Sequence, residues 1–406
     1  NRFLTILMKH IYVSGLGVVS AAGRDVCSNV ASMKCGQSRL SPVLRFHTAV
    51  KVPVGEIPDT DIDLKAELGI RADGIMSRTA LLGLKAVREA VEDCARRVGS
   101  LKGRRIAFIS GTSVGGMDLS EVFWENNRGD LSRGDVELLK MHSPGAVTSA
   151  MAEYITAFTG ELAFVTTIST ACSAAGNAIM TGARMLRCGM ADVVIAGGTD
   201  ALCRFTLNGF NSLRILDEDV CRPFDDSRSG LNLGEGAGYL ILTGIEGNAY
   251  CTLSGWGNAN EAYHQTSSTP DGIGPGLAMS SALTMAGLHP EDIGFINTHG
   301  TGTQVNDLAE SNAMLRVFGG EVPPFSSLKP YVGHTLGASE GIEAALVCKA
   351  LRDGDMSFMG STGFSAPIKE TGLAPYVGGP MDVPANVLSS AFGFSGNCVS
   401  LIFSRL

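Results

Sequence analysis

Two segments of this chain repeat one plan, in which an apolar strand leads through a short turn into a helix made largely of small residues. The segments are TTISTACSAAGNAIMTGARMLRCG at residues 166–189 and SSLKPYVGHTLGASEGIEAALVCKALRDG at residues 326–354. A helix with Ala, Gly and Ser on several faces does not suit a protein surface, because an exposed face would carry charge and small side chains let neighbouring elements approach closely. We therefore predict that these two helices form a central buried layer between two sheets.

Strand-like runs rich in Val and Ile alternate with helical segments along the chain, which is typical of an α/β fold with sheets buried on both faces. Because a single core rarely grows beyond about 250 to 300 residues, the 406 residues favour two halves, each with one copy of the repeated unit. We place the halves at residues 8–249 and 250–406 and expect them to pack tightly, since no Pro/Ser-rich linker separates them. Residues 1–7 precede a start-like Met8 and are expected to be a cloning remnant or upstream translation. The strand-like runs are residues 11–17, 105–112, 164–170, 192–198, 293–300 and 387–394.

Charge and cysteine content exclude several classes of protein. Lys and Arg total 32 against 40 Asp and Glu, a net charge of −8, and no long run of like charges marks a nucleic-acid-binding arm. The ten cysteines include no CxxC pair and no Cys/His cluster with zinc spacing, so we expect reduced thiols and no metal site. No apolar stretch approaches the roughly 20 residues of a membrane helix, and no signal peptide is visible. These features predict a soluble, cytoplasmic protein.

Cys172 lies in STACSAAGN, at the turn between a strand and the first small-residue helix. The free N–H groups and the dipole at a helix N-terminus favour a thiolate over a thiol. Most cysteines are buried structural residues, and we assign that role to the other nine. A turn of this kind presents a side chain well, so we predict that Cys172 is a nucleophile.

Two histidines and a lysine occupy similar turns. His299 follows an apolar strand in INTHGTGTQVND, and His334 lies in SSLKPYVGHTLGAS, shortly after Lys329. A lone histidine is more often structural than catalytic. Two histidines in Gly-rich turns at strand ends, together with a nucleophile in a third such turn, favour a catalytic role.

Two other motifs have a competing interpretation. GTSVG at residues 111–115 fits the G-x-S-x-G elbow of a hydrolase, but Ser113 as nucleophile would leave the Cys172 turn unexplained. GLGVVS at residues 15–20 approaches a dinucleotide fingerprint, but Ser20 replaces the third glycine and no ribose-binding acid follows. We set both aside.

Several separate motifs, in order, resemble the elongating β-ketoacyl-acyl carrier protein synthases, which have a Cys-His-His site. They are TACSAAGN, NTHGTGTQVND, SSLKPYVGHTLGASEGIEA and AFGFSGN, and the similarity extends over residues 10–406, including RPFDDSRSGLNLGEGAG at 222–238. The resemblance implies the thiolase-like five-layered αβαβα sandwich of two pseudo-duplicated halves. This implied fold agrees with the duplication inferred from the repeated unit.

The resemblance also implies a role for each matching residue. Cys172 would take an acyl chain from a carrier-protein or coenzyme A thioester, and His299 and His334 would act on the incoming malonyl-carrier thioester. Decarboxylation requires stabilisation of an enolate oxygen, which two imidazole N–H groups provide. The backbone N–H groups of Cys172 and Phe394 match the family's oxyanion hole.

Further matching residues would support these groups. Lys329 matches the lysine beside the second histidine, where an ammonium would favour a neutral His334; a structural ion pair with Glu343 is the alternative. Asp307 and Glu343 would hold the site together rather than react.

The same resemblance assigns substrate contacts and a gate. Thr301 and Thr303 match positions that hydrogen-bond the phosphopantetheine arm. Phe394 fits the gating aromatic residue of the family, and Gly393 and Gly396 would be its hinges.

The sequence departs from the family pattern at several positions. Ser395 and Asn397 change the usual Gly-Phe-Gly-Gly-Thr turn, and we expect a stiffer gate. His142 stands where fatty-acid enzymes commonly carry a large aromatic residue near the tunnel and the dimer interface, and Val114 and Phe210 fall where chain length is often controlled. These differences favour a specialised pathway over ordinary fatty-acid synthesis.

We therefore predict an acyltransferase that condenses an acyl thioester, through acyl-Cys172, with malonyl-acyl carrier protein in fatty-acid or specialised polyketide-type synthesis. No bound cofactor is expected, because the substrates travel on the phosphopantetheine of acyl carrier protein. The basic cluster expected to dock that carrier protein is reduced in this sequence to Lys65 and Arg71. The family is dimeric, so a homodimer or a heterodimer with a related subunit is expected. The alternatives are the catalytic partner of a ketosynthase/chain-length-factor pair, a non-decarboxylating thiolase-fold acyltransferase, and a purely structural subunit.

Overall fold

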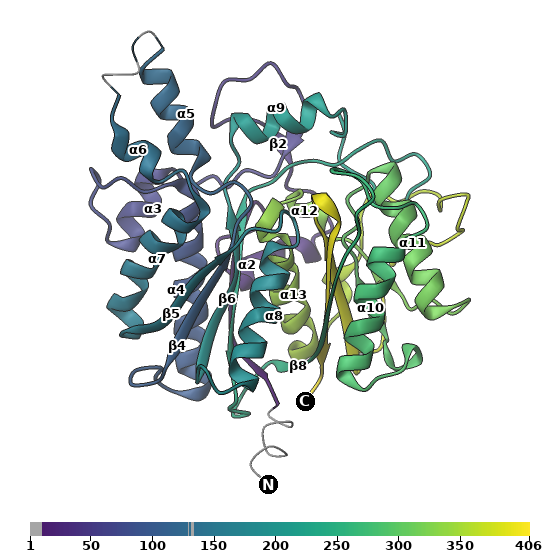
Figure 1. Cartoon of the computed structure of the whole chain (residues 1–406). Coiled ribbons are helices and arrows are strands. Elements are labelled where there is room, and N and C mark those ends of the chain that lie inside the picture. Colours follow the sequence, from purple (N-terminus) through teal and green to yellow (C-terminus); the bar gives the residue numbers. More distant parts are fainter. Residues whose placement is uncertain (1–9, 129, 131–133) are drawn as a thin grey trace.

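The computed structural model describes residues 10–128, 130 and 134–406, so the expected remnant at residues 1–7 lies outside the described residues. Figure 1 shows strands through the middle of the molecule and helices packed on both sides of them. In this described part of the chain, no helix is both long enough and apolar enough to cross a membrane.

The first half of the chain builds five neighbouring strands of a ten-stranded sheet. Their order is β5-β4-β6-β7-β1, in which β4 runs parallel to β5 and β6, whereas β7 is antiparallel to β6 and β1. Strands β4, β6 and β7 are buried along their whole length, as expected for strands covered on both faces. The bounds are β1 (Tyr12–Ser20), β4 (Ile106–Gly111), β5 (Leu162–Ile168), β6 (Val193–Asp200) and β7 (Gly236–Thr243).

The second half repeats this arrangement. Its order is β10-β9-β11-β12-β8, with β9 parallel to β10 and β11, and with β12 antiparallel to β11 and β8. In chain order, both halves therefore place their strands third, second, fourth, fifth and first, with the same directions. This shared topology confirms the predicted duplication. The bounds are β8 (Cys251–Asn260), β9 (Phe295–Asn297), β10 (Phe325–Ser326), β11 (Asn386–Phe392) and β12 (Asn397–Ser404).

The two five-stranded sets are joined at one end. Strands β1 and β8 pair antiparallel where Tyr12 faces Thr252 and Val13 faces Cys251. Through these pairs the sets form one continuous hydrogen-bonded sheet rather than two separate ones. The join places the first strand of each half side by side.

Six helices complete the predicted five layers. α4 and α7 pack on the first set of strands, α10 packs on the second set together with its neighbour α11, and α8 and α13 contact strands of both sets from between them. The order is therefore αβαβα, as predicted. The bounds are α4 (Arg78–Val98), α7 (Pro144–Thr159), α8 (Ala174–Arg187), α10 (Ile273–Ala286), α11 (Gln304–Phe318) and α13 (Ser339–Asp353).

Close contacts explain why the central helices consist of small residues. A Cβ atom on Gly341 of α13 would lie 2.3 Å from the Gly238 carbonyl oxygen in β7, and one on Gly176 of α8 would lie 2.5 Å from a methyl group of Val399 in β12. Neither distance is compatible with a real side chain. The predicted buried central layer is therefore confirmed.

Shorter elements surround this framework. α3 begins after the N-cap Thr60, whose side chain accepts a hydrogen bond from Asp63 N, and ends at Gly69 in the left-handed conformation. Figure 1 places α5 and α6 at one edge of the molecule and α9 at the end of the sheet where α12 lies. These elements are α2 (Val26–Lys34), β2 (Ser41–Pro42), β3 (Pro53–Val54), α3 (Asp61–Leu68), α5 (Met117–Asn126), α6 (Val136–Lys140), α9 (Arg204–Ser212), η2 (Pro290–Asp292), α12 (Lys329–Val332), η3 (Leu336–Ala338), η4 (Ser357–Met359) and η5 (Phe394–Gly396).

Candidate active site

The turn that carries Cys172 joins β5 to α8, as predicted. Ala171 adopts the left-handed backbone conformation with φ 52°, which turns the chain sharply before the helix, and Cys172 is only 4% exposed. Burial raises the pKa of the Cys172 thiol to about 12, and the positive charge of Lys329 and the backbone N–H of Phe394 offset this only in part. The prediction that the helix N-terminus maintains a thiolate is therefore wrong, because desolvation outweighs the favourable dipole. The thiol keeps its proton and needs a base.

His334 lies beside the sulfur and can act as that base. Its Nε2 atom is 3.0 Å from Cys172 Sγ, and its Nδ1 atom is 2.9 Å from Ser339 Oγ. Its backbone N–H donates to Asn232 O at 2.7 Å, which fixes the segment between α12 and η3. Burial, and then the charge of Lys329, hold the pKa of His334 well below 6.5. The ring is therefore neutral and can accept a proton.

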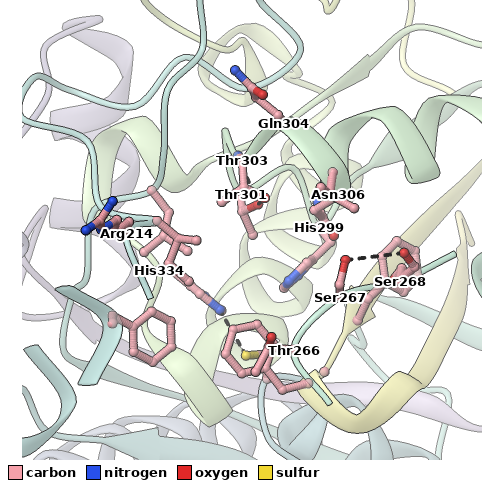
Figure 2. Close-up of a pocket in the computed structure, with 18 of the residues that line it drawn as sticks. Arg214, Thr266, Ser267, Ser268, His299, Thr301, Thr303, Gln304, Asn306 and His334 are labelled. Carbon is pink, nitrogen blue, oxygen red and sulfur yellow. Dashed lines mark hydrogen bonds between the residues drawn. The ribbon is translucent and has the colours of Figure 1, made fainter. Parts of the chain in front are cut away.

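His299 follows β9 and faces the same space. Its ring is edge-on to His334, with the two centroids 5.2 Å apart, and Figure 2 shows both rings pointing toward the sulfur. The backbone N–H groups of His299 and Gly300 donate to the two carboxyl oxygens of Glu310, each at 2.8 Å, which holds the turn. Burial, then the charges of Lys329 and His334, keep the pKa of His299 well below 6.5. Its Nδ1 atom is buried and has no hydrogen-bond partner among the described residues.

Lys329 forms the ion pair that the sequence offered as an alternative. Its Nζ atom lies 2.8 Å from Glu343 Oε1, and the two side chains are 1% and 3% exposed. Asn297 Nδ2 donates to the other carboxyl oxygen of Glu343 at 3.3 Å. The same ammonium lowers the pKa of both His299 and His334. The structural contact and the electrostatic effect on the histidines therefore exist together.

Two backbone N–H groups converge on the sulfur. Those of Phe394 and Cys172 itself both lower the pKa of the Cys172 thiol through hydrogen bonds. Phe394 begins η5, and a Cβ atom on the preceding Gly393 would lie 2.6 Å from Thr170 O. The turn of Phe394 therefore rests directly on the nucleophile turn.

Two cavities meet at Cys172. One, of about 340 Å³, is lined by both histidines and by hydroxyl and amide side chains as well as apolar ones, and we call it the polar branch; the other, of about 310 Å³, is almost wholly apolar. Phe210 and Phe394 line both, and their rings stack with centroids 5.6 Å apart and planes 16° apart. The stacked pair therefore stands at the junction of a polar branch and an apolar branch.

The predicted substrate contacts divide between these branches. Thr301 and Thr303 line the polar branch, and their hydroxyl oxygens lie 2.9 Å apart. Val114 and Phe210 line the apolar branch. His142 lines neither: it is exposed, and its Nδ1 atom lies 2.8 Å from Ser120 Oγ. The sequence suggested that His142 lies near the tunnel and the dimer interface; within this single chain it lines neither cavity, and its place at an interface stays a prediction.

Asp307 supports the histidine turn, as expected. It is fully buried and accepts hydrogen bonds from the backbone N–H of Gly302 at 3.2 Å and of Phe224 at 2.9 Å. Lys65 and Arg71, which the resemblance suggested as docking residues, lie elsewhere on the surface. Lys65 reaches Ala72 O, and Arg71 pairs with Asp73.

The GTSVG turn does not form a hydrolase elbow. The buried carboxylate of Asp200 accepts hydrogen bonds from the backbone N–H of Ser113 and Gly337, at 2.9 and 2.7 Å to the same oxygen. Ser113 Oγ is buried without a hydrogen-bond partner among the described residues, so no base activates it. The turn instead ties the end of β4 to η3, beside the apolar branch.

Sequence reasoning missed several residues of the site. Ser339 contacts His334, and Glu310 holds the His299 turn. Ser339 lies inside the motif that contains His334, and Glu310 lies three residues beyond the motif that contains His299, on α11. Gln304 and Asn306 also line the polar branch and lie inside the His299 motif without having been singled out. Other residues lining it had no signal in the sequence; they are Arg214, Thr266, Ser267 and Ser268 (Figure 2).

Two family models match the chain. Residues 8–246 match the family described as beta-ketoacyl synthase, N-terminal domain, and residues 250–358 match the family described as beta-ketoacyl synthase, C-terminal domain. The two matches are consecutive and together cover most of the chain.

Individual proteins are similar over nearly the whole length. Nodulation protein E of Rhizobium sp. (strain N33) is 30% identical over 412 residues, which covers 98% of this chain and 100% of the relative. The 3-oxoacyl-[acyl-carrier-protein] synthase 2 of Staphylococcus aureus (strain COL) is 28% identical and covers 98% of each. Among solved structures, the ishigamide ketosynthase/chain length factor superposes with a TM-score of 0.89 at 28% identity, covering 98% of this chain and 99% of that chain.

Proposed function

Because the chain belongs to the β-ketoacyl synthase family, we propose that Cys172 carries the acyl chain and that His299 and His334 serve the condensation. The enzyme is an acyltransferase that joins an acyl thioester to malonyl-acyl carrier protein with loss of carbon dioxide and forms 3-ketoacyl-acyl carrier protein. The observation that carries the residue roles is the 3.0 Å approach of His334 Nε2 to Cys172 Sγ, with the His299 ring beside it.

The first step of the proposed mechanism is acylation of Cys172. Neutral His334 takes the thiol proton, because the buried thiol does not ionise by itself. The sulfur attacks the thioester carbonyl, and the backbone N–H groups of Cys172 and Phe394 stabilise the oxyanion. The thiolate of the carrier arm leaves and takes the proton from His334.

The second step is decarboxylation and carbon–carbon bond formation. The malonyl carboxylate leaves as carbon dioxide, and the electron pair of the broken bond forms an enolate whose oxygen accepts hydrogen bonds from His299 and His334. The enolate carbon attacks the acyl-Cys172 carbonyl, and the bond to sulfur breaks. Cys172 then regains a proton, which solvent supplies through His334.

The two steps require different tautomers of His334. Acylation requires Nε2 without hydrogen, whereas condensation requires an N–H donor there. The Ser339 hydroxyl, 2.9 Å from Nδ1, can accept a hydrogen bond from that nitrogen or donate one to it. The arrangement therefore suits both steps.

The polar branch is proposed to receive the phosphopantetheine arm of acyl carrier protein, which carries both substrates. Support comes from the hydroxyl groups of Thr301 and Thr303 along its wall and from the carrier-protein substrate in the name of the Staphylococcus relative. The apolar branch is proposed to receive the acyl chain. Its side chains Val114, Phe210 and Leu336 suit hydrocarbon.

We further propose that a second subunit completes the apolar branch. Phe205 and Leu213, which line it, are 62% and 44% exposed, so this branch opens at the molecular surface. Phe164 and Val165 of the edge strand β5 are also exposed, at 42% and 39%. Exposed apolar groups around a substrate cavity favour a covering partner. The solved ketosynthase/chain length factor supports a related chain as one form of that partner, and a second copy of this chain is the other.

The pathway and location are also proposals. The names of the Rhizobium relative and of the ishigamide structure support a specialised pathway rather than housekeeping fatty-acid synthesis. All ten cysteines are free, which supports a reducing, cytoplasmic location. The size of the purified chain in solution, alone and with a candidate partner, decides between a homodimer and a heterodimer.

Intact-mass analysis with a panel of acyl-carrier thioesters tests the proposed nucleophile. Wild type and the control Cys188→Ala, which removes an exposed thiol, should both gain the acyl mass, and Cys172→Ala should gain none. Malonyl-acyl carrier protein added next should release a 3-ketoacyl product from the first two. Equal labelling of Cys172→Ala would overturn the assignment.

A further inference from the structure

The side chain of Asn397 bridges the nucleophile turn and the turn of Phe394. Asn397 begins β12 and directly follows η5. Its Oδ1 atom lies 2.7 Å from Ser173 Oγ and 2.7 Å from Asn177 Nδ2. Because Ser173 is the N-cap of α8 and Asn177 lies in the first turn, Asn397 ties the start of the nucleophile helix to the end of the Phe394 turn.

Three neighbouring amides, those of Asn258, Asn177 and Asn397, share one hydrogen-bond network. Asn258 Nδ2 donates to Asn177 Oδ1 at 2.8 Å, and the NH₂ group of Asn177 donates to Asn397 Oδ1 at 2.7 Å and to Thr170 Oγ1 at 2.9 Å. A flipped Asn397 would place its own NH₂ group against that of Asn177, and the two donors would repel. The Asn397 oxygen is therefore an acceptor for the nucleophile helix.

The turn between these contacts has little freedom to move. Gly393 N donates to Asn397 O at 2.7 Å, which closes the turn, and a Cβ atom on Gly393 would clash with Thr170 O at 2.6 Å. Ser395 adopts φ 69°, a left-handed conformation that is unfavourable for a residue other than glycine. Surrounding contacts must hold such a turn in place. Asn397 supplies the side-chain contacts on the nucleophile side.

We propose that Asn397 is a positioning residue, whose side-chain oxygen holds the Phe394 turn against the nucleophile turn and keeps the Phe394 N–H aimed at the reacting atoms on Cys172. This inference rests on the proposed function, since it concerns the oxyanion that forms there. Without the amide, Ser173 Oγ keeps Thr170 O and Asn177 Nδ2 keeps Thr170 Oγ1 as acceptors, but the side-chain link from both residues to the Phe394 turn is lost. The backbone donor can then move away from Cys172.

Steady-state kinetics on three variants test this role. Loss of one oxyanion donor typically lowers kcat by about 10²–10³-fold. Asn397→Ala loosens the donor without removing it, so this variant should lower kcat by about 10- to 100-fold. Its KM for malonyl-acyl carrier protein should stay within about twofold of wild type. Asn397→Asp keeps an acceptor oxygen and should recover most of the loss. Asn260→Ala is the matched control, because Asn260 faces Asn397 across the strands but its side chain is exposed and, among the residues that the structure describes, reaches only Glu261 O at 3.5 Å.

Two results would overturn the inference in a folded, active enzyme: wild-type kcat in Asn397→Ala, or an Asn397→Asp variant as slow as Asn397→Ala. If wild type is neither acylated nor active in condensation, the proposed function fails instead. In that case, amide hydrogen exchange tests the positioning role of Asn397 without any need for catalytic activity. Exchange within residues 393–397 should become at least about tenfold faster in Asn397→Ala and stay at the wild-type rate in Asn260→Ala. Unchanged exchange in Asn397→Ala would overturn the inference.

Discussion

The substitution Lys329→Met separates two effects of the buried lysine. In the wild type, Lys329 Nζ lies 2.8 Å from Glu343 Oε1, and its charge also lowers the pKa of His299 and His334. Methionine is similarly long and flexible but uncharged, so the variant removes the charge with little change in packing. One consequence concerns stability and the other concerns catalysis.

The stability change follows from the carboxyl group left behind. Burial raises the pKa of Glu343 above 4.5, and Lys329 is the partner that lowers it most, so Glu343 should bind a proton in the variant. A carboxyl group that takes up a proton on folding lowers the free energy of unfolding by about 1.4 kcal/mol for each pH unit above its ordinary pKa. Because the pKa of Glu343 is already raised in the wild type, the deficit of the variant comes only from the further rise on loss of Lys329. The roughly 3–5 kcal/mol typical of a broken buried ion pair bounds this deficit from above.

Urea unfolding between pH 5 and pH 7 measures this change. A raised pKa in the folded state gives stability that is present at low pH and lost as pH rises, so the deficit of Lys329→Met should be small at pH 5 and should grow toward pH 7 by up to about 1.4 kcal/mol per pH unit. The double variant Lys329→Met/Glu343→Gln carries neither charge and should recover most of the stability. A deficit that does not vary with pH would refute the reasoning.

The catalytic change should persist in the double variant. Without Lys329, the pKa values of both histidines rise, and acylation requires His334 in its neutral form. The acidic limb of the acylation rate, followed by stopped flow, should therefore move to higher pH in the single and the double variant. If the acidic limb of the acylation rate stays at the wild-type pH in the double variant, the charge of Lys329 has no effect on the histidines in catalysis, and its role is limited to the ion pair with Glu343.

Two further variants test other parts of the site. Burial, followed by the charge of Glu343, raises the pKa of Glu340 well above 4.5. The free energy of unfolding should therefore fall less steeply from pH 5 to pH 8 in Glu340→Gln than in wild type, by about 1.4 kcal/mol per pH unit, whereas the exposed control Glu321→Gln should behave as wild type. Parallel curves for Glu340→Gln and wild type would contradict this. Phe210→Ala removes one ring of the stack with Phe394 and should let longer acyl donors label the enzyme in the mass panel; an unchanged chain-length limit would contradict the proposed role of the stack.

The sequence predicted those features that depend on neighbouring residues. Ala, Gly and Ser on several faces of residues 166–189 and 326–354 required close contact, and the glycine approaches to both sets of strands have that cause. The turn before α8 carries Cys172 because a strand and a helix adjoin it in the chain. The repeated unit likewise indicated the duplicated topology, since it recurs once in each half. The division at residues 249 and 250 stays a prediction.

The remaining features depend on tertiary contacts that no local pattern encodes. The thiol of Cys172 is protonated because distant segments bury it, and the helix dipole, a local property, predicted the opposite. Asn397 and Ser173 are separated by 224 positions, and His334 and Cys172 by 162, so their contacts appear only in the folded chain. His142 was expected near the tunnel and the dimer interface from its position in a motif, and within the single chain its Nδ1 atom contacts Ser120 Oγ.

A single-turnover experiment on His299→Ala tests the central claim most directly. The enzyme is first acylated at Cys172, and malonyl-acyl carrier protein labelled in the free carboxylate is then added while labelled carbon dioxide and 3-ketoacyl product are followed. Because His334 lies at the sulfur and His299 does not, His299→Ala should acylate at nearly the wild-type rate yet release carbon dioxide and product at least about 100-fold more slowly. Wild-type release from His299→Ala would contradict the assignment of the two histidines.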